Sequence, residues 1–128
     1  MDTILLIGRI LFGGYFVLMG INHFRKSKML TGYSKSKGIP FARLSVIVSG
    51  LFLLFGGLGI VLGVYVKIAL LLIVIFLILA SFLVHNFWRE SDSESRASEM
   101  QSFLKNIALL GATIMLYALF ANDWLYTL

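Results

Sequence analysis

The stretch LSVIVSGLFLLFGGLGIVLGVYVKIALLLIVIFLILASFLV (residues 44–84) contains one charged residue, Lys67. As one continuous helix rising 1.5 Å per residue it would be roughly 60 Å long, about twice the hydrocarbon thickness of a bilayer. A single span cannot have that length, so the chain must reverse within it, between Gly63 and Lys67. The stretch therefore predicts a tight hairpin of two membrane helices, over about 44–64 and 68–88.

Two further apolar stretches, 4–24 and 103–121, have a similar length. Of the 128 residues, 59% are hydrophobic and 13% are charged, and the mean hydropathy is +0.94. A soluble domain carries about 25% charged residues, so the charges here cannot cover a water-exposed surface. The sequence predicts a single all-α membrane domain over residues 1–128, an integral four-helix bundle.

Lysine and arginine residues are distributed unevenly between the predicted connections. Nine of the 11 lie in or beside segments 25–43 and 89–102, whereas Arg9 and Lys67 lie toward the opposite side. The positive-inside rule then places both segments in the cytoplasm and both termini on the outer side of the plasma membrane. Basic residues beside spans are typical of contact with lipid headgroups, so we expect the bilayer, and no nucleic acid, as a partner.

The connections also carry local signals. Apolar residues at helical spacing within 27–35 predict a short helix lying in the interface. Trp88 is expected at the inner interface, and Trp124 and Tyr126 at the outer one. Segment 89–102 is rich in serine and charge and is expected to be a mobile loop. Its four acids are expected to be solvated: Glu90, Asp92, Glu94 and Glu99.

Several classes of chemistry are excluded or disfavoured by composition. The chain has no cysteine, which excludes a thiol redox relay and cysteine-bound metal clusters. No phosphate-binding loop, zinc-protease motif or nucleophile–base pair is present. We therefore expect no metal site. Whether the chain takes part in catalysis stays open; if it does, we expect it to be part of a quinone-linked oxidoreductase and not catalytic alone.

The first predicted span carries an arginine within the membrane. Arg9, Gly13, Phe16, Gly20 and His23 share one helical face. An ionisable group inside a bilayer is costly, and such residues are often retained for function. Arg9 is therefore a candidate binding residue for an anionic headgroup or a quinone carbonyl. Snorkelling to water or pairing within the protein is the favoured alternative, because Arg9 lies near the end of its helix.

The third and fourth predicted spans add polar candidates near the inner side. Ser81, His85 and Trp88 are expected to share a face, and His85 and His23 lie at equivalent depths. Two histidines can ligate a haem, an interpretation that we disfavour. They can also serve the protonation of a quinone. The more common role of histidines at an interface is to form hydrogen bonds. Asn106 begins a polar stripe on the fourth span that favours hydrogen bonding between helices.

Three groups of residues resemble the DoxX family of small membrane proteins. They are GRILFGG (8–14); YSKSKGIP (33–40) with SG (49–50) and GG (56–57); and HNFW (85–88) with FLKNIALLG (103–111). The resemblance covers nearly the whole chain and implies a four-helix membrane bundle. It also implies kinship with the membrane subunit of a thiosulfate:quinone oxidoreductase and with other accessory redox subunits. Four residues match positions that recur in the family: Arg9, His85, Trp88 and Asn106. His23 does not match such a position and is more individual to this chain.

These observations favour an accessory subunit of a membrane redox system. A quinone or lipid pocket is expected near Arg9 or the His23 and His85 end, with a redox protein or a second copy of the chain as partner. The alternative is a non-enzymatic membrane scaffold or assembly factor. A small-solute carrier comes third, because no inverted repeat or broken helix is evident.

Overall fold

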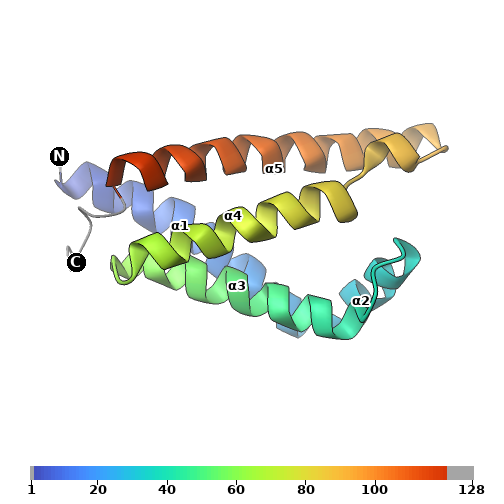
Figure 1. Ribbon diagram of the computed structural model, residues 1–128, viewed down its shortest axis with the longest axis horizontal. Helices are drawn as coiled ribbons and strands as arrows, with labels where there is room; N and C mark the ends of the chain where they lie inside the picture. Colours follow the sequence, from blue (N-terminus) through green and yellow to red (C-terminus); the bar gives the residue numbers. More distant parts are fainter. Residues whose placement is uncertain (1, 121–128) are drawn as a thin grey trace.

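The computed structural model describes residues 2–120, and in this part of the chain every regular element is a helix. Antiparallel helices lie side by side, so that α1 begins and α5 ends at the same end of the bundle (Figure 1). The other end, called here the α2 end, holds α2, η1 and the start of α5. The elements are α1 (Asp2–Arg25), α2 (Ser27–Ser36), α3 (Ala42–Leu62), α4 (Val66–Leu83), the 3₁₀ helix η1 (Phe87–Arg89) and α5 (Ser93–Phe120).

Four segments are long and apolar enough to cross a bilayer: Thr3–Arg25, Ala42–Leu62, Val66–Arg89 and Ser93–Leu119. Large apolar side chains point away from the bundle along all of them, which is the pattern of helices surrounded by lipid. The predicted all-α membrane bundle is confirmed. Which end faces the cytoplasm stays a prediction, and Trp124 and Tyr126 lie outside the described residues.

The hairpin between α3 and α4 is confirmed. Gly63 ends α3 in the left-handed conformation, with φ of 71°, and its N–H donates to the Gly59 carbonyl oxygen at 2.9 Å. Glycine adopts this conformation without the steric cost that a side chain adds. Three residues, Gly63 to Tyr65, separate the two helices, so the chain reverses within the segment that the sequence indicates.

Two expectations about the α2 end are wrong. Helix α4 ends at Leu83, before residue 88, so Ser81, His85 and Trp88 do not share a helical face. Segment 89–102 is not a loop either, because α5 begins at Ser93. The reason is local: the Asp92 carboxylate accepts the Ser95 backbone N–H at 2.9 Å, which is the contact of a helix N-cap.

Helices α1 and α3 pack with their backbones in contact, through glycines spaced seven residues apart on each helix. A Cβ atom added to Gly57 would lie 2.6 Å from the Gly13 carbonyl oxygen, and one added to Gly20 would lie 2.8 Å from the Leu54 backbone nitrogen. A real side chain does not fit at these distances. Four residues form this contact, called here the glycine seam: Gly13 and Gly20 of α1, Gly50 and Gly57 of α3.

Gly59 and Gly63, predicted from the sequence to allow close helix packing, have different roles. A Cβ added to Gly59 would lie 2.6 Å from the Ala69 Cβ, so this glycine brings α4 close to α3, whereas Gly63 terminates α3. The apolar core lies between the helices beside these contacts. Its largest fully buried side chains include Phe16, Leu53, Ile60, Leu70, Ile73 and Leu77.

Substituting Gly57→Ala should destabilise the bundle by about 1–3 kcal/mol, because the added methyl group forces the α1 and α3 backbones apart. The matched control is Gly14→Ala, since a Cβ at Gly14 meets nothing within 4 Å. Unfolding of the purified protein by increasing mole fraction of dodecyl sulfate measures the difference. Equal stability of the two variants would contradict the seam.

Candidate functional site

Arg9 is buried, with 2% of its surface exposed, and it binds the end of α3. Its Nε donates to the Ile60 carbonyl oxygen at 3.2 Å, and one terminal nitrogen donates to that of Val61 at 2.9 Å. Both carbonyls lie in the last turn of α3, where carbonyl groups have no partner within the helix. The positive guanidinium also complements the negative end of the helix dipole. Arg9 therefore caps α3 from α1.

The two histidines occupy different environments. His23 Nδ1 donates to the Met19 carbonyl oxygen at 2.9 Å, and its ring lies edge-on to Phe76. His85 lies just after α4, in the linker to η1, where its backbone N–H donates to the Ala80 carbonyl oxygen. Its ring nitrogen Nδ1 faces the carboxylate oxygen Oε2 of Glu99, 3.5 Å away.

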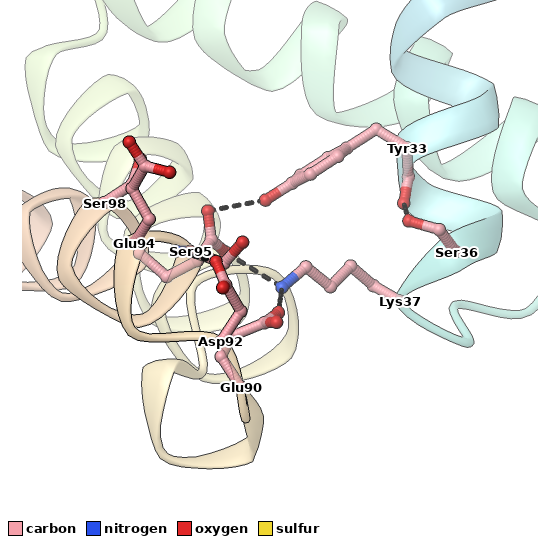
Figure 2. Close-up of a pocket in the computed structure, with 9 residues that line it drawn as sticks. Tyr33, Ser36, Lys37, Glu90, Asp92, Glu94, Ser95 and Ser98 are labelled. Atoms are coloured by element: carbon pink, nitrogen blue, oxygen red, sulfur yellow. Dashed lines mark hydrogen bonds and ion pairs between the residues drawn. The ribbon is translucent and has the colours of Figure 1, made fainter.

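Glu99 gathers polar side chains from both sides of the α2 end. Its Oε1 accepts the Tyr33 hydroxyl at 2.7 Å, and Lys37 Nζ lies 3.0 Å from its Oε2. Lys37 also donates to Glu90 Oε1 at 2.5 Å. Figure 2 shows the side chains of Tyr33, on α2, and Lys37, just after α2, directed toward the acidic side of the cavity. These five residues are called here the Glu99 cluster: Tyr33, Lys37, His85, Glu90 and Glu99.

The expectation that all four acids are solvated is wrong for Glu99, whose side chain is 12% exposed. Sequence reasoning missed this residue because a solvated loop was expected where α5 begins. Tyr33 and Lys37 are four residues apart and so lie on one face of α2 or just beyond its end. That spacing was the available signal, but it does not name a partner.

The cluster changes the pKa values of Lys37 and Tyr33. Burial lowers the pKa of Lys37, but the adjacent carboxylates of Glu90 and Glu99 raise it more, and the pKa ends above its ordinary value. The pKa of Tyr33 is raised by burial, and further by its hydrogen bond to Glu99 and the charges of both acids. At neutral pH, Lys37 is therefore charged and Tyr33 neutral.

An outer cavity of about 580 Å³ opens beside the cluster (Figure 2). Acids and serines of the α5 start form one wall, and α2 forms the other. The pKa of Asp92 is lowered because its carboxylate, which caps α5, accepts the backbone N–H of Ser95. The lining residues are Tyr33, Ser36, Lys37, Glu90, Asp92, Glu94, Ser95, Ser98 and Glu99.

An inner cavity of about 40 Å³ lies deeper, between α1, α3, α4 and α5. Its polar lining residues are Tyr15, His85, Lys105 and Asn106, and no carboxylate lines it. Lys105 Nζ lies 5.8 Å from the centre of the Tyr15 ring, so these two side chains bridge α5 and α1. The cavity therefore offers hydrogen-bond donors in an otherwise apolar surrounding. Its apolar lining residues are Phe16, Met19, Leu53, Phe76 and Leu77.

The structure brings together two of the five candidate residues from the sequence. His85 and Asn106 both line the inner cavity. Arg9 caps α3 toward the opposite end, and His23 is not among the lining residues. Trp88 is 46% exposed and packs edge-on against Phe103. Among residues 2–120, no three histidine or acidic side chains are placed to hold a metal ion.

Fold and site together define a small multi-pass helical membrane protein with a buried polar cluster at one end of its bundle. The DoxX family model matches residues 4–86, more than half of the chain, and the chain belongs to the DoxX family. The match includes Arg9 and His85 and ends before Glu99 and Asn106. Comparisons with curated proteins and with solved structures give no match.

The stability that Tyr33 and Lys37 contribute should be lost at alkaline pH. Both groups hold their proton more tightly in the folded chain, so the unfolded chain releases protons first as pH rises past the ordinary values of 10.0 and 10.5. The stabilisation from these two groups should thus be constant near neutral pH and fall above about pH 10. Thermal unfolding at a series of pH values measures this. A Tyr33→Phe variant should show a shallower fall, and an identical fall would contradict the assignment.

Proposed function

We propose that this DoxX protein is an accessory subunit of a membrane redox system, and that it binds the head of an isoprenoid quinone at the inner cavity. The observation that carries the proposal is the group of donors that lines this cavity within the membrane bundle: Tyr15, His85, Lys105 and Asn106.

The chemistry of the cavity suits a quinone better than a cation. Quinone carbonyls and the oxyanions formed on reduction accept hydrogen bonds, and an ammonium, an imidazole and an amide can all donate them. A lysine beside an oxyanion stabilises it strongly where water is excluded. The apolar lining, including Phe76 and Leu77, suits the quinone ring. The isoprenoid tail would stay among the lipids.

The cavity as it stands holds about one water molecule, so a quinone ring needs it to widen. The structure supplies a route for this. Within residues 2–120, α1 and α5 have no backbone contact, and the Lys105 side chain bridges them over Tyr15. Because Lys105 is exposed and lines the cavity, we infer that movement of its side chain opens the cavity toward the lipid.

The remaining parts of the proposal concern placement. The α2 end carries most of the basic residues, and the positive-inside rule places it on the cytoplasmic side of the plasma membrane. A redox protein partner, docked at that end, supplies the electrons. The Arg9 end is not the proposed site, because the guanidinium is directed at the α3 carbonyls.

Quinone binding tests the proposal with a matched pair of variants. Lys105 lies over Tyr15 at 5.8 Å, and Lys67 lies over Tyr117 at 5.9 Å outside the cavity lining. In lipid nanodiscs, Lys105→Ala should weaken binding of a short-tailed ubiquinone or menaquinone analogue by about tenfold, the loss of one hydrogen bond to a charged group. Lys67→Ala should leave it unchanged.

The same titration in His85→Ala should show a similar loss. If neither Lys105→Ala nor His85→Ala changes the affinity, the analogue does not bind at this cavity and the proposal fails. Mass spectrometry of organic extracts from gently purified protein gives an independent reading, since a copurified quinone is expected.

A second candidate function is a non-enzymatic scaffold, and the outer cavity favours it. Its acids, including Glu94 and Asp92, lie at an open surface that can receive a basic segment of a partner protein. Crosslinking in membranes separates the two functions: a stoichiometric partner without any bound quinone supports the scaffold. No observation supports a small-solute carrier, because α1, α3, α4 and α5 are continuous and lack the breaks at the membrane midplane that are typical of carriers.

A further inference from the structure

We infer that Glu99 and His85 form a proton relay that joins the outer, water-facing cavity to the inner cavity within the membrane bundle. The inference deepens the proposed function, and it rests on that function only for the identity of the proton acceptor.

The geometry places one member of the pair in each cavity. Glu99 lines the outer cavity and is absent from the lining of the inner one, whereas His85 lines the inner cavity only. Their facing atoms, Oε2 and Nδ1, are 3.5 Å apart and are both buried. No other residue pair among the described contacts links the two cavities in this way.

Both facing atoms keep hydrogen-bonding capacity. Within residues 2–120, neither His85 Nδ1 nor Glu99 Oε2 makes a hydrogen bond of good geometry, and the cation nearest to Oε2 is Lys37 Nζ at 3.0 Å. A buried polar atom without a partner is costly and uncommon. Here the two atoms face each other, so a proton placed between them satisfies both. A small movement converts 3.5 Å into a hydrogen bond.

The surrounding charges hold the pair in place from every side. The Tyr33 hydroxyl from α2 and the Lys37 ammonium from the residue after α2 hold the Glu99 carboxylate. Glu90, just after η1, shares the charge of Lys37. From α5, Lys105 carries a positive charge close to His85 and lines the same inner cavity. The carboxylate is thus held by Tyr33 at Oε1 and by Lys37 at Oε2, and Oε2 also faces the imidazole.

The transfer involves protons alone. A proton from water in the outer cavity binds Glu99 Oε2 and then passes to His85 Nδ1. The proton on His85 Nε2 leaves at the same time to an acceptor in the inner cavity, which is a reduced quinone oxygen under the proposed function. The neutral ring then carries its proton on Nδ1, and transfer of this proton to Nε2 through water restores the starting tautomer. The Glu99 carboxylate takes the next proton from the outer cavity. Reduction of the quinone itself draws its electrons from the redox partner.

Proton exchange at the histidine ring nitrogens tests the relay without any quinone present. The probe is the full-length protein with ¹⁵N-labelled histidine in lipid nanodiscs, observed by NMR. Glu99→Gln should slow the exchange of His85 ring protons with water by about tenfold or more, since a positioned acid–base group contributes at least that factor to proton transfer.

Two controls are built into the chain. Glu90→Gln removes the other carboxylate that contacts Lys37 but leaves the Glu99–His85 contact. It should therefore not slow the exchange of His85 ring protons with water. His23 is the second histidine of the chain, lines neither cavity, and should exchange at an unchanged rate in every variant. If Glu99→Gln does not fold, Glu99→Asp keeps the charge and withdraws it from His85, with the same slowing expected.

The relay is overturned if His85 exchanges as fast in the Glu99 variant as in the wild type. Equal slowing in Glu90→Gln, or at His23, also overturns it, because the effect would then not pass through this contact. If the quinone analogue does not bind, but Glu99→Gln still slows proton exchange at His85, the proposed function is wrong and the relay stands. The reverse result would remove the relay alone.

Discussion

The close contact of α1 with α3 is the constraint on which the rest of the structure depends. In lipid, burial of apolar surface does not drive helices together, so close packing and polar contacts must do so. The glycine seam brings the two backbones within van der Waals distance. At one end of the seam Arg9 satisfies the carbonyls of Ile60 and Val61, and this contact stabilises a buried charge and a helix terminus together. With α1 fixed in this way, Tyr15 and Phe16 form one wall of the inner cavity.

The chemistry of the α2 end follows from where two helices stop and start. Because α4 ends at Leu83, His85 leaves the helical register, and because α5 begins at Ser93, Glu99 is held on a rigid element. The two residues therefore face each other, and Lys37, which follows α2, approaches Glu99 as well. A buried polar cluster in this position links the aqueous surface to the interior of a membrane bundle. The proposed binding of a quinone and the proposed proton relay both depend on this link.

The sequence predicts the features that are set locally. Span length and Lys67 are enough to locate the α3–α4 hairpin, and the helical period is enough to place Arg9 on the face of Gly13 and Gly20. It does not predict the features that depend on an exact helix end. The shared face of Ser81 and His85 failed because α4 stops early, and Glu99 was missed because Asp92 caps a helix within a segment of loop-like composition. The pairing of α2 with α5 is purely tertiary, so no local pattern could reveal it. Which of the candidate residues carry function stays a prediction.

The position of the Arg9 guanidinium tests the account most directly. Solid-state NMR of protein in phospholipid bilayers can measure dipolar couplings from the ¹⁵N-labelled guanidinium of Arg9 to backbone ¹³C carbonyls and to ³¹P of the lipid headgroups. The account predicts couplings to the carbonyls of both Ile60 and Val61, and none to phosphorus. Coupling to phosphorus without coupling to these carbonyls would show that Arg9 extends to the membrane surface, and would contradict the α1–α3 arrangement described above.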